Sequence, residues 1–196
     1  MIDLKSASET SDEELVKLTL ENQDNFLYLV DRYKARLTNY ILRLTNVNAE
    51  DAEDILQDVF IKVYLNLNDF NKDLKFSSWI YRITHNQVIS QHRKLKARPE
   101  GYAVDIEDQA ARHLAADVDI AAEADLHIFK ANILKVLNKL DGQYREILVL
   151  RFLEEKSYQE ISDILKKSPG TVASALNKAK QELRRELSQQ NINLSL

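Results

Sequence analysis

The sequence predicts an all-α protein made of two small helical domains, a four-helix N-terminal domain and a C-terminal helix-turn-helix domain, joined by an acidic linker. Three observations predict this fold class. The 196 residues include only three glycines and two prolines, apolar side chains recur at three- and four-residue steps, and serine-based caps precede several of these runs. Parallel or antiparallel strands would instead need alternating patterns and frequent turn residues.

Several classes of protein are excluded by composition. No stretch of eighteen apolar residues is present, so no membrane-spanning helix is expected. The first residues lack the basic start and apolar core of a secretory signal. With no cysteine, disulfides and thiolate chemistry are also excluded. We therefore expect a cytoplasmic protein.

The N-terminal domain, residues 1–98, is expected to hold four helices. Ser11 and Glu14 form a capping box for the first helix, and apolar periodicity defines the second. Asn48 can cap the third helix, whose first turn is acidic, and Ser77 can cap the fourth. The expected spans are residues 11–20, 24–44, 49–67 and 77–94.

An acidic segment separates the domains. Pro99 and Gly101 end the fourth helix, and residues 100–125 contain eight acids and one base. Such a composition packs no core by itself, so residues 99–124 are interpreted as a linker. The C-terminal domain then covers residues 125–196. Its expected helices end at Asp141, run from 144 to 154, begin at the Ser157 capping box, and run from Ser168 to about residue 187.

The last two of these helices match a helix-turn-helix, residues 157–187. The first turns of the second helix would enter the major groove, and its lysine-rich rear would lie near phosphates. Spacing places Thr171, Ser174 and Asn177 toward the bases and Lys178 and Lys180 near phosphates. From spacing alone, an ordinary helical hairpin with a solvated charged face fits equally well.

A second candidate surface combines aromatic and basic residues between Phe70 and Arg98. The formal net charge is −4, but residues 82–98 carry five bases and no acid, and such a local strip can bind phosphates. Aromatic rings beside cations are typical of single-strand binding. Composition alone favours the alternative that Phe76 and Trp79 are core residues.

A third candidate surface is an acidic helix face. Asp51, Asp54 and Asp58 recur at helical steps, with Gln57 beside them and apolar residues opposite. Such a face is either simply solvated or complementary to a basic partner.

His85 and His92 share a helix face but lack a carboxylate at ligand spacing, so no metal site is predicted. No cofactor site and no catalytic constellation are visible, and an enzyme is not expected.

Taken in order, these segments resemble the sigma-70 family of bacterial RNA polymerase sigma factors, in its small two-domain, extracytoplasmic-function (ECF) group. The N-terminal resemblance rests on DAEDILQDVF at residues 51–60 and FSSWIYRITHN at residues 76–86. The C-terminal resemblance rests on YREIL at residues 144–148, SYQEI at residues 157–161 and GTV at residues 170–172. The ordered set is far more specific than any single motif.

The resemblance implies a sigma factor that binds core RNA polymerase and directs promoter-specific transcription initiation. It implies an anti-sigma factor as regulator and an acidic linker that threads the polymerase channel. The acidic face, Asp51, Asp54, Gln57 and Asp58, would dock on the clamp helices of the β′ subunit. The implied −10 contacts are Phe70, Asn71, Lys72, Phe76, Trp79, Arg82, Asn86, Arg93 and Lys94. The implied −35 contacts are Ser168, Gly170, Thr171, Ser174, Asn177, Lys178 and Lys180.

The chain departs from the family pattern in its recognition helix. Ala173 and Ala175 stand where the family often has a basic residue, and Lys167-Ser168-Pro169 replaces a more hydrophobic entry. Two other interpretations stay open. A stand-alone helix-turn-helix repressor or activator, with a ligand-sensing N-terminal domain, would be a dimer on a palindromic site and would have no use for the acidic face or the acidic linker. A sigma-like chain that only titrates an anti-sigma factor would not need to bind DNA.

Overall fold

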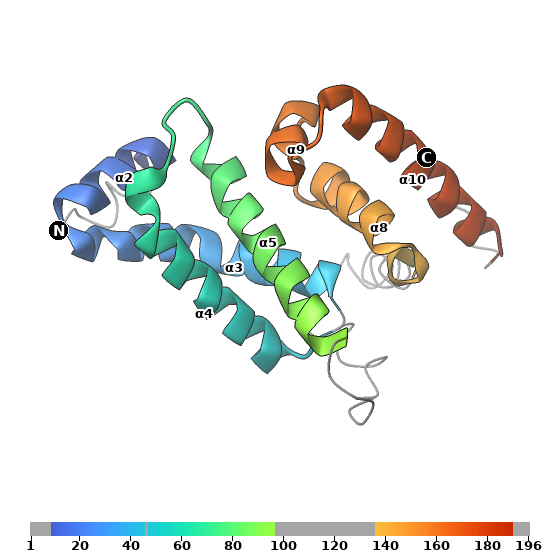
Figure 1. Ribbon diagram of the computed structural model, residues 1–196, viewed down its shortest axis with the longest axis horizontal. Coiled ribbons are helices and arrows are strands. Elements are labelled where there is room, and N and C mark those ends of the chain that lie inside the picture. The colour runs from blue at the N-terminus through green and yellow to red at the C-terminus, as the bar shows by residue number, and fades with distance from the viewer. Residues whose placement is uncertain (1–8, 46, 97–135, 190–196) are drawn as a thin grey trace, which may run out of the picture. The chain divides into compact units, whose positions relative to one another are not determined.

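The computed structural model describes residues 9–45, 47–96 and 136–189, and throughout these ranges the regular structure is helical (Figure 1). The protein is thus an all-α protein, as predicted. It divides into two compact units, one made chiefly of helices α2 to α5 and the other chiefly of α8 to α10. The expected linker, residues 99–124, lies outside the described residues. None of the described helices is both long and apolar enough to span a membrane.

The first unit contains the four expected helices. They are α2 (Asp12–Glu21), α3 (Phe26–Leu44), α4 (Ala49–Leu65) and α5 (Phe76–Lys96). Two short 3-10 turns, η1 (Gln23–Asn25) and η2 (Leu67–Asp69), follow α2 and α4. The expected helices included part of each turn, and for η2 the reason is that Leu67 continues the apolar line of α4. Leu67 of η2 is buried in line with the apolar residues of α4.

Helix α2 is fixed to α3 by polar contacts. The Ser11 hydroxyl accepts from the backbone N–H of Glu14 at 3.2 Å, which is the Ser11 half of the predicted capping box. Asp12 then pairs with Arg32 at 2.6 Å and accepts a hydrogen bond from the Tyr33 hydroxyl. Burial, followed by the hydrogen bond to Asp12, raises the pKa of Tyr33 well above its usual range. The phenol therefore stays a donor at any physiological pH.

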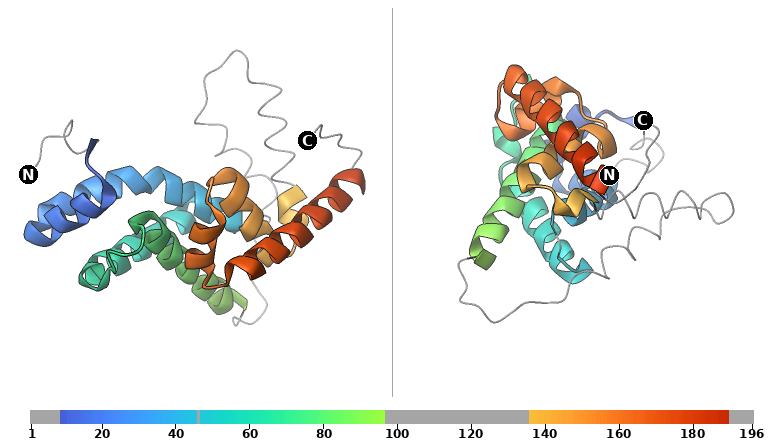
Figure 2. Two further views of the ribbon diagram at one scale, coloured as in Figure 1. Left: turned by 90° about the horizontal axis from the view of Figure 1, so that it is seen from above. Right: turned by 90° about the vertical axis from the view of Figure 1, so that its right-hand side faces the viewer.

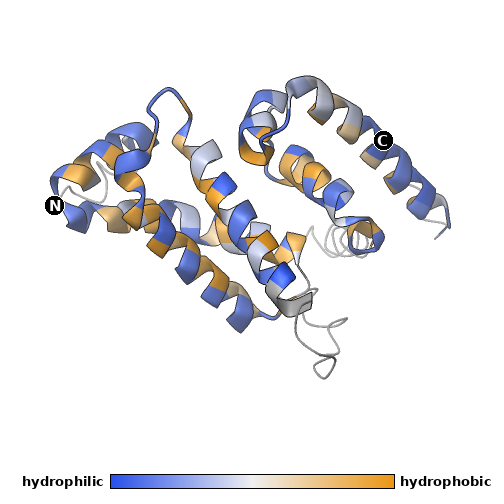
Figure 3. Ribbon diagram, viewed as in Figure 1, coloured by the Kyte–Doolittle hydropathy of each residue, from blue (hydrophilic) through white to orange (hydrophobic). Residues whose placement is uncertain are grey.

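The core of the first unit is formed by the apolar faces of α3, α4 and α5. Figure 3 shows apolar and polar faces alternating along α4, with the period expected of a half-buried helix. Full burial of one such side chain contributes about 1.5–3 kcal/mol. The buried residues of α4 are Ala52, Ile55, Leu56, Val59 and Val63.

Helix α5 begins one residue before the predicted cap. Trp79 N–H donates to the Lys75 carbonyl at 3.2 Å, so Lys75 occupies the cap position and Ser77 lies inside the first turn. The Ser77 cap is therefore wrong. The side-chain acceptor at this helix start comes instead from a residue distant in sequence. The Glu13 carboxylate accepts a hydrogen bond from the backbone N–H of Phe76 at 3.2 Å.

The second unit contains the end of a helix at residues 136–139, then α8 (Gly142–Leu148), α9 (Tyr158–Leu165) and α10 (Pro169–Gln189). Figure 2 shows α10 as one long, straight helix. Asp141 caps α8 by accepting from Gln143 N–H at 2.9 Å. The helix expected to continue to residue 154 widens after Leu148 into a π-helical turn, η3 (Val149–Leu153).

Helices α9 and α10 form the predicted helix-turn-helix. The Ser157 capping box is confirmed: Ser157 Oγ accepts from Glu160 N–H at 3.2 Å, and the Glu160 carboxylate accepts from Ser157 N–H at 2.9 Å. Helix α9 ends at Lys166, which adopts the left-handed conformation with φ 53°. Ser168 then caps α10 by accepting from Thr171 N–H at 3.2 Å.

Candidate nucleic-acid and polymerase interfaces

The acidic face of α4 is exposed, as its spacing predicted. Asp51, Asp54, Gln57 and Asp58 are all exposed, on the side of the helix away from the buried apolar residues. The Asp58 carboxylate is also fixed by a hydrogen bond from α5, because its Oδ2 accepts from Gln87 Nε2 at 2.7 Å. A carboxylate fixed in this way loses less side-chain entropy when a cationic partner binds it.

Gln87 connects this face to the next surface. It is 4% exposed and lies on α5, where its Nε2 binds Asp58 and its Oε1 accepts a hydrogen bond from Lys62 Nζ. The buried Gln87 amide thus orients two side chains of α4: Asp58, on the acidic face, and Lys62, one turn further along the helix. Buried amides with both ends satisfied rigidify the elements they join.

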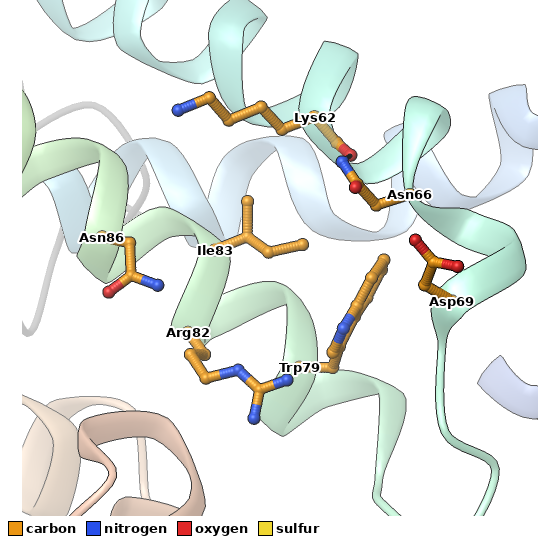
Figure 4. Close-up of a pocket in the computed structure, with 7 residues that line it drawn as sticks. All are labelled: Lys62, Asn66, Asp69, Trp79, Arg82, Ile83 and Asn86. Atoms are coloured by element: carbon orange, nitrogen blue, oxygen red, sulfur yellow. Dashed lines mark hydrogen bonds between the residues drawn. The ribbon is translucent and has the colours of Figure 1, made fainter.

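A groove of about 330 Å³ opens between the end of α4 with η2 and the first half of α5 (Figure 4). It brings together three residues expected at the −10 element, Trp79, Arg82 and Asn86. The other lining residues were not predicted, and they are Lys62, Asn66, Asp69 and Ile83. The spacing of Lys62 and Asn66, at i and i+4, was a usable signal, because such residues lie on the same side of a helix. Asp69 lies in η2, beyond the end of α4 at Leu65, so the helical spacing does not extend to it. The signal was missed because the polar residues from Asn66 onward were taken to break the helical pattern.

The aromatic residues of the same segment are buried. Phe70, Phe76 and Trp79 form a cluster with ring centroids 5.4–5.7 Å apart, and Tyr33 of α3 joins it through Phe76 at 5.6 Å. The three rings are at most 6% exposed. This is the core alternative that composition favoured for Phe76 and Trp79, although Trp79 also borders the groove.

The polar members of the expected −10 set lie on two parts of the chain, the connection before α5 and α5 itself. Asn71 and Lys72 are exposed on the connection before α5, where Asn71 Oδ1 accepts from Asp73 N–H at 3.0 Å. Asn86 and Arg93 are exposed on α5, and Arg82 is half-buried. The side chain of Lys94 lies outside the described residues.

The N-terminal half of α10 lines a second concave surface, of about 610 Å³. It gathers five of the seven residues expected at the −35 element: Ser168, Gly170, Thr171, Ser174 and Lys178. The remaining lining residues are Gln143, Tyr144, Lys167 and Ala175.

The other two residues expected at the −35 element lie elsewhere on α10. Asn177 is exposed without lining the surface. Lys180 lies over the ring of Phe152, with its Nζ 5.5 Å from the ring centroid. Lys167, immediately before the cap, is a cation of this surface that was not among the predicted −35 contacts.

Gly170 has no structural need to be glycine. A Cβ added there would meet only the Ser168 hydroxyl, at 4.0 Å.

Within the part of the chain that the structure describes, no group of three or more acidic or histidine side chains could hold a metal ion.

Comparison with known proteins gives matches to both units. The model of Sigma-70 region 2 matches residues 29–98, and that of Sigma-70 region 4 matches residues 130–183. The chain is 34% identical over 173 residues to the ECF RNA polymerase sigma factor SigW of Bacillus subtilis, covering 85% of this chain and 90% of SigW. It is 29% identical over 170 residues to the ECF RNA polymerase sigma-E factor of Escherichia coli K12, covering 83% and 86%.

Solved structures agree in fold. CnrH, in complex with the cytosolic domain of CnrY, superposes with a TM-score of 0.68 at 25% identity, covering 92% of this chain and 99% of CnrH. The sigma factor RpoE of Bartonella quintana, in complex with the anti-sigma factor NepR, gives a TM-score of 0.61 at 22% identity, covering 84% and 97%.

Proposed function

The chain belongs to the ECF group of RNA polymerase sigma factors and directs promoter-specific transcription initiation, and from this premise we propose how its own residues divide that work. Residues 1–98 dock on core polymerase and recognise and melt the −10 element. Residues 125–196 recognise the −35 element, and the acidic linker, residues 99–124, occupies the polymerase channel. The ranges matched by the two family models, 29–98 and 130–183, support these boundaries.

Docking on polymerase uses the acidic face of α4. Asp51, Asp54, Gln57 and Asp58 face solvent together, which suits them to the basic clamp helices of the β′ subunit. The observation that supports this assignment best is Asp58, whose carboxylate is exposed yet held by a buried amide. A face that only promoted solubility would gain nothing from a carboxylate fixed in this way.

Recognition of the −10 element uses the groove between α4 and α5 and the connection before α5. Arg82, Asn86, Asn71 and Lys72 supply contacts to an unpaired strand, with Arg93 and Lys94 further along α5. The rings of Phe70, Phe76 and Trp79 support the connection from inside. This assignment follows from their burial and gives the aromatics a mainly structural role in place of the direct −10 contacts that the family resemblance implied.

Recognition of the −35 element uses the concave surface of α10. Thr171 and Ser174 face the bases, and Lys167 and Lys178 approach the phosphates on either side. Only two cations line this surface, so the C-terminal unit alone binds duplex weakly and gains its affinity from tethering through polymerase.

An anti-sigma factor regulates this protein. The relative RpoE was solved with its anti-sigma factor NepR, and exposed apolar residues on both units could meet such a partner. The protein acts in the cytoplasm, needs no cofactor and has no catalytic activity of its own.

Run-off transcription with purified core RNA polymerase on a promoter library tests the proposal. We expect transcripts only when the chain is added, from promoters that share two spaced elements. A stand-alone regulator would bind a palindrome as a dimer without co-purifying with core enzyme. A chain that merely titrates an anti-sigma factor would bind that factor and give no transcripts.

A further inference from the structure

Two opposite charges of α4 stand at the spacing of an ion pair. Asp58 and Lys62 are four residues apart on this helix and both are exposed. An acid four residues before a base is the favourable order for pairing on a helix surface. Figure 4 shows the Lys62 side chain directed away from Asn66, so it leans back toward the preceding turn, as long helical side chains do. Helix geometry alone therefore predicts a direct pair between Asp58 and Lys62.

The structure has an amide in place of this pair. Gln87 Nε2 donates to Asp58 Oδ2 at 2.7 Å, and Gln87 Oε1 accepts from Lys62 Nζ. Within the part of the chain that the structure describes, no ion pair joins Asp58 to Lys62 or to another base. A glutamine carries a donor and an acceptor on one neutral group. It therefore satisfies both ions without neutralising the charge of either.

This arrangement matters for a carboxylate that has to bind a partner. If Asp58 were paired with Lys62, that pair would have to break first, and an exposed pair can lower the affinity for a competing cation by up to about fivefold. Gln87 bonds to Oδ2, which leaves Oδ1 to accept from a partner while the amide contact persists. Because Gln87 is only 4% exposed, its amide also has little freedom to follow the charges elsewhere.

We propose that Gln87 is a positioning residue that keeps Asp58 from pairing with Lys62, and so leaves the charge of Asp58 to a cation of the polymerase. The inference rests on the proposed docking role of the acidic face of α4. It adds a buried residue of another helix, α5, that sets how strongly this face binds.

The test compares Gln87→Met in two backgrounds, with the full chain titrated against core RNA polymerase. Methionine is unbranched like glutamine, and its thioether cannot donate and accepts only weakly. In the wild-type background we expect the change to lower affinity by about fivefold, because Asp58 pairs with Lys62 and also loses its fixed orientation. In a Lys62→Met background no such pair can form. Only the loss of orientation remains there, and the same change should cost about twofold.

Equal losses in the two backgrounds would overturn the proposal, because a glutamine that only supports the packing of α4 against α5 has no reason to depend on Lys62. Gln87→Leu is a second apolar variant and should show the same dependence on Lys62. Gln91→Met is the matched control, since Gln91 is a half-buried glutamine one turn further along α5, and it should bind core enzyme as the wild type does. Thermal unfolding followed by circular dichroism shows whether each variant is folded.

Asp58→Asn separates this inference from the proposed docking role. It removes the charge and keeps an oxygen that can accept from Gln87, so it should weaken binding to core enzyme. Wild-type affinity for Asp58→Asn would mean that the docking role of Asp58 is wrong, and the inference would fall with it. A clear loss for Asp58→Asn, together with equal losses for Gln87→Met in the two backgrounds, would overturn the role of Gln87 alone.

Discussion

The Glu13 carboxylate of α2 accepts a hydrogen bond from the backbone N–H of Phe76 at the start of α5, at 3.2 Å. An acid at a helix N-terminus satisfies an unpaired donor and interacts favourably with the helix dipole. Helix α2 lies before the range matched by the region 2 model, yet it supplies this contact at the first residue of α5.

Glu13→Ala should therefore destabilise the first unit by about 1 kcal/mol. Trp79, the single tryptophan of the chain, lies in the first turn of α5 and reports locally in urea unfolding followed by fluorescence. Glu13→Gln keeps an acceptor oxygen and should recover most of the stability. Glu14→Ala, which removes only an exposed pair with Lys17, should cost less. Equal losses for Glu13→Ala and Glu14→Ala would mean that the contact with Phe76 contributes nothing.

Asp54→Lys should weaken binding to core polymerase by at least about 2 kcal/mol, because it reverses a charge at the centre of the proposed docking face. Affinity can be measured by titrating labelled protein with core enzyme. Glu53→Lys makes the same change on the neighbouring exposed residue outside the face and should have a smaller effect. Asp58→Lys is a less clean test, since it also removes the acceptor of Gln87. Wild-type affinity for Asp54→Lys would place the docking face elsewhere.

Ala175→Arg should strengthen binding of the full chain to −35 duplex. Ala175 lines the concave surface of α10 beside Thr171, so an added cation would reach a phosphate. The dependence of log affinity on log salt should steepen by about 0.9, the value for one contact. Ala173 is half-buried and lines no part of this surface, so Ala173→Lys serves as control. Equal gains from both changes would mean that another face of α10 meets the DNA.

Lys166→Gly should stabilise the second unit by up to about 1 kcal/mol. Lys166 follows α9 in the left-handed conformation, with φ 53°. This conformation costs a non-glycine residue about 1–2 kcal/mol, a cost that glycine would remove. Part of the stability gained is offset, because glycine has more conformational entropy than lysine in the unfolded chain. Thermal unfolding followed by circular dichroism measures the effect. Lys167, whose φ is not positive, is the control, and Lys167→Gly should destabilise. A loss of stability for Lys166→Gly would show that its side chain contributes more than its backbone strain costs.

The sequence predicted the helices well because their signals are local. Apolar steps in α4 and the capping box of α9 involve residues three or four apart, and the structure places both where the pattern indicated. The Glu13 contact joins residues 63 positions apart, and no local pattern encodes it. Ser77 was therefore a reasonable cap that tertiary structure overrode.

The candidate sites were less predictable for a related reason. Trp79 and Asn86 were identified because they fall in a family motif, whereas Asn66 and Asp69 come from the polar end of α4 and η2. Such residues are ordinary at a helix end, and only the packing of α4 against α5 turns them into one wall of a groove. The burial of Phe70, Phe76 and Trp79 likewise depends on their contacts with one another and with Tyr33.

Promoter opening by holoenzyme carrying Asn86→Ala tests whether the groove between α4 and α5 contacts the melted −10 strand. Asn86 is an exposed residue of the groove, so its loss should affect contacts made only to separated bases. Gel shift would measure closed-complex affinity, and permanganate reactivity of unpaired thymines would measure opening. We predict closed-complex binding near that of the wild type and opening reduced about tenfold, the loss expected for one base contact. Equal loss at both steps, or unchanged opening, would contradict the assignment of this groove to the melted −10 strand.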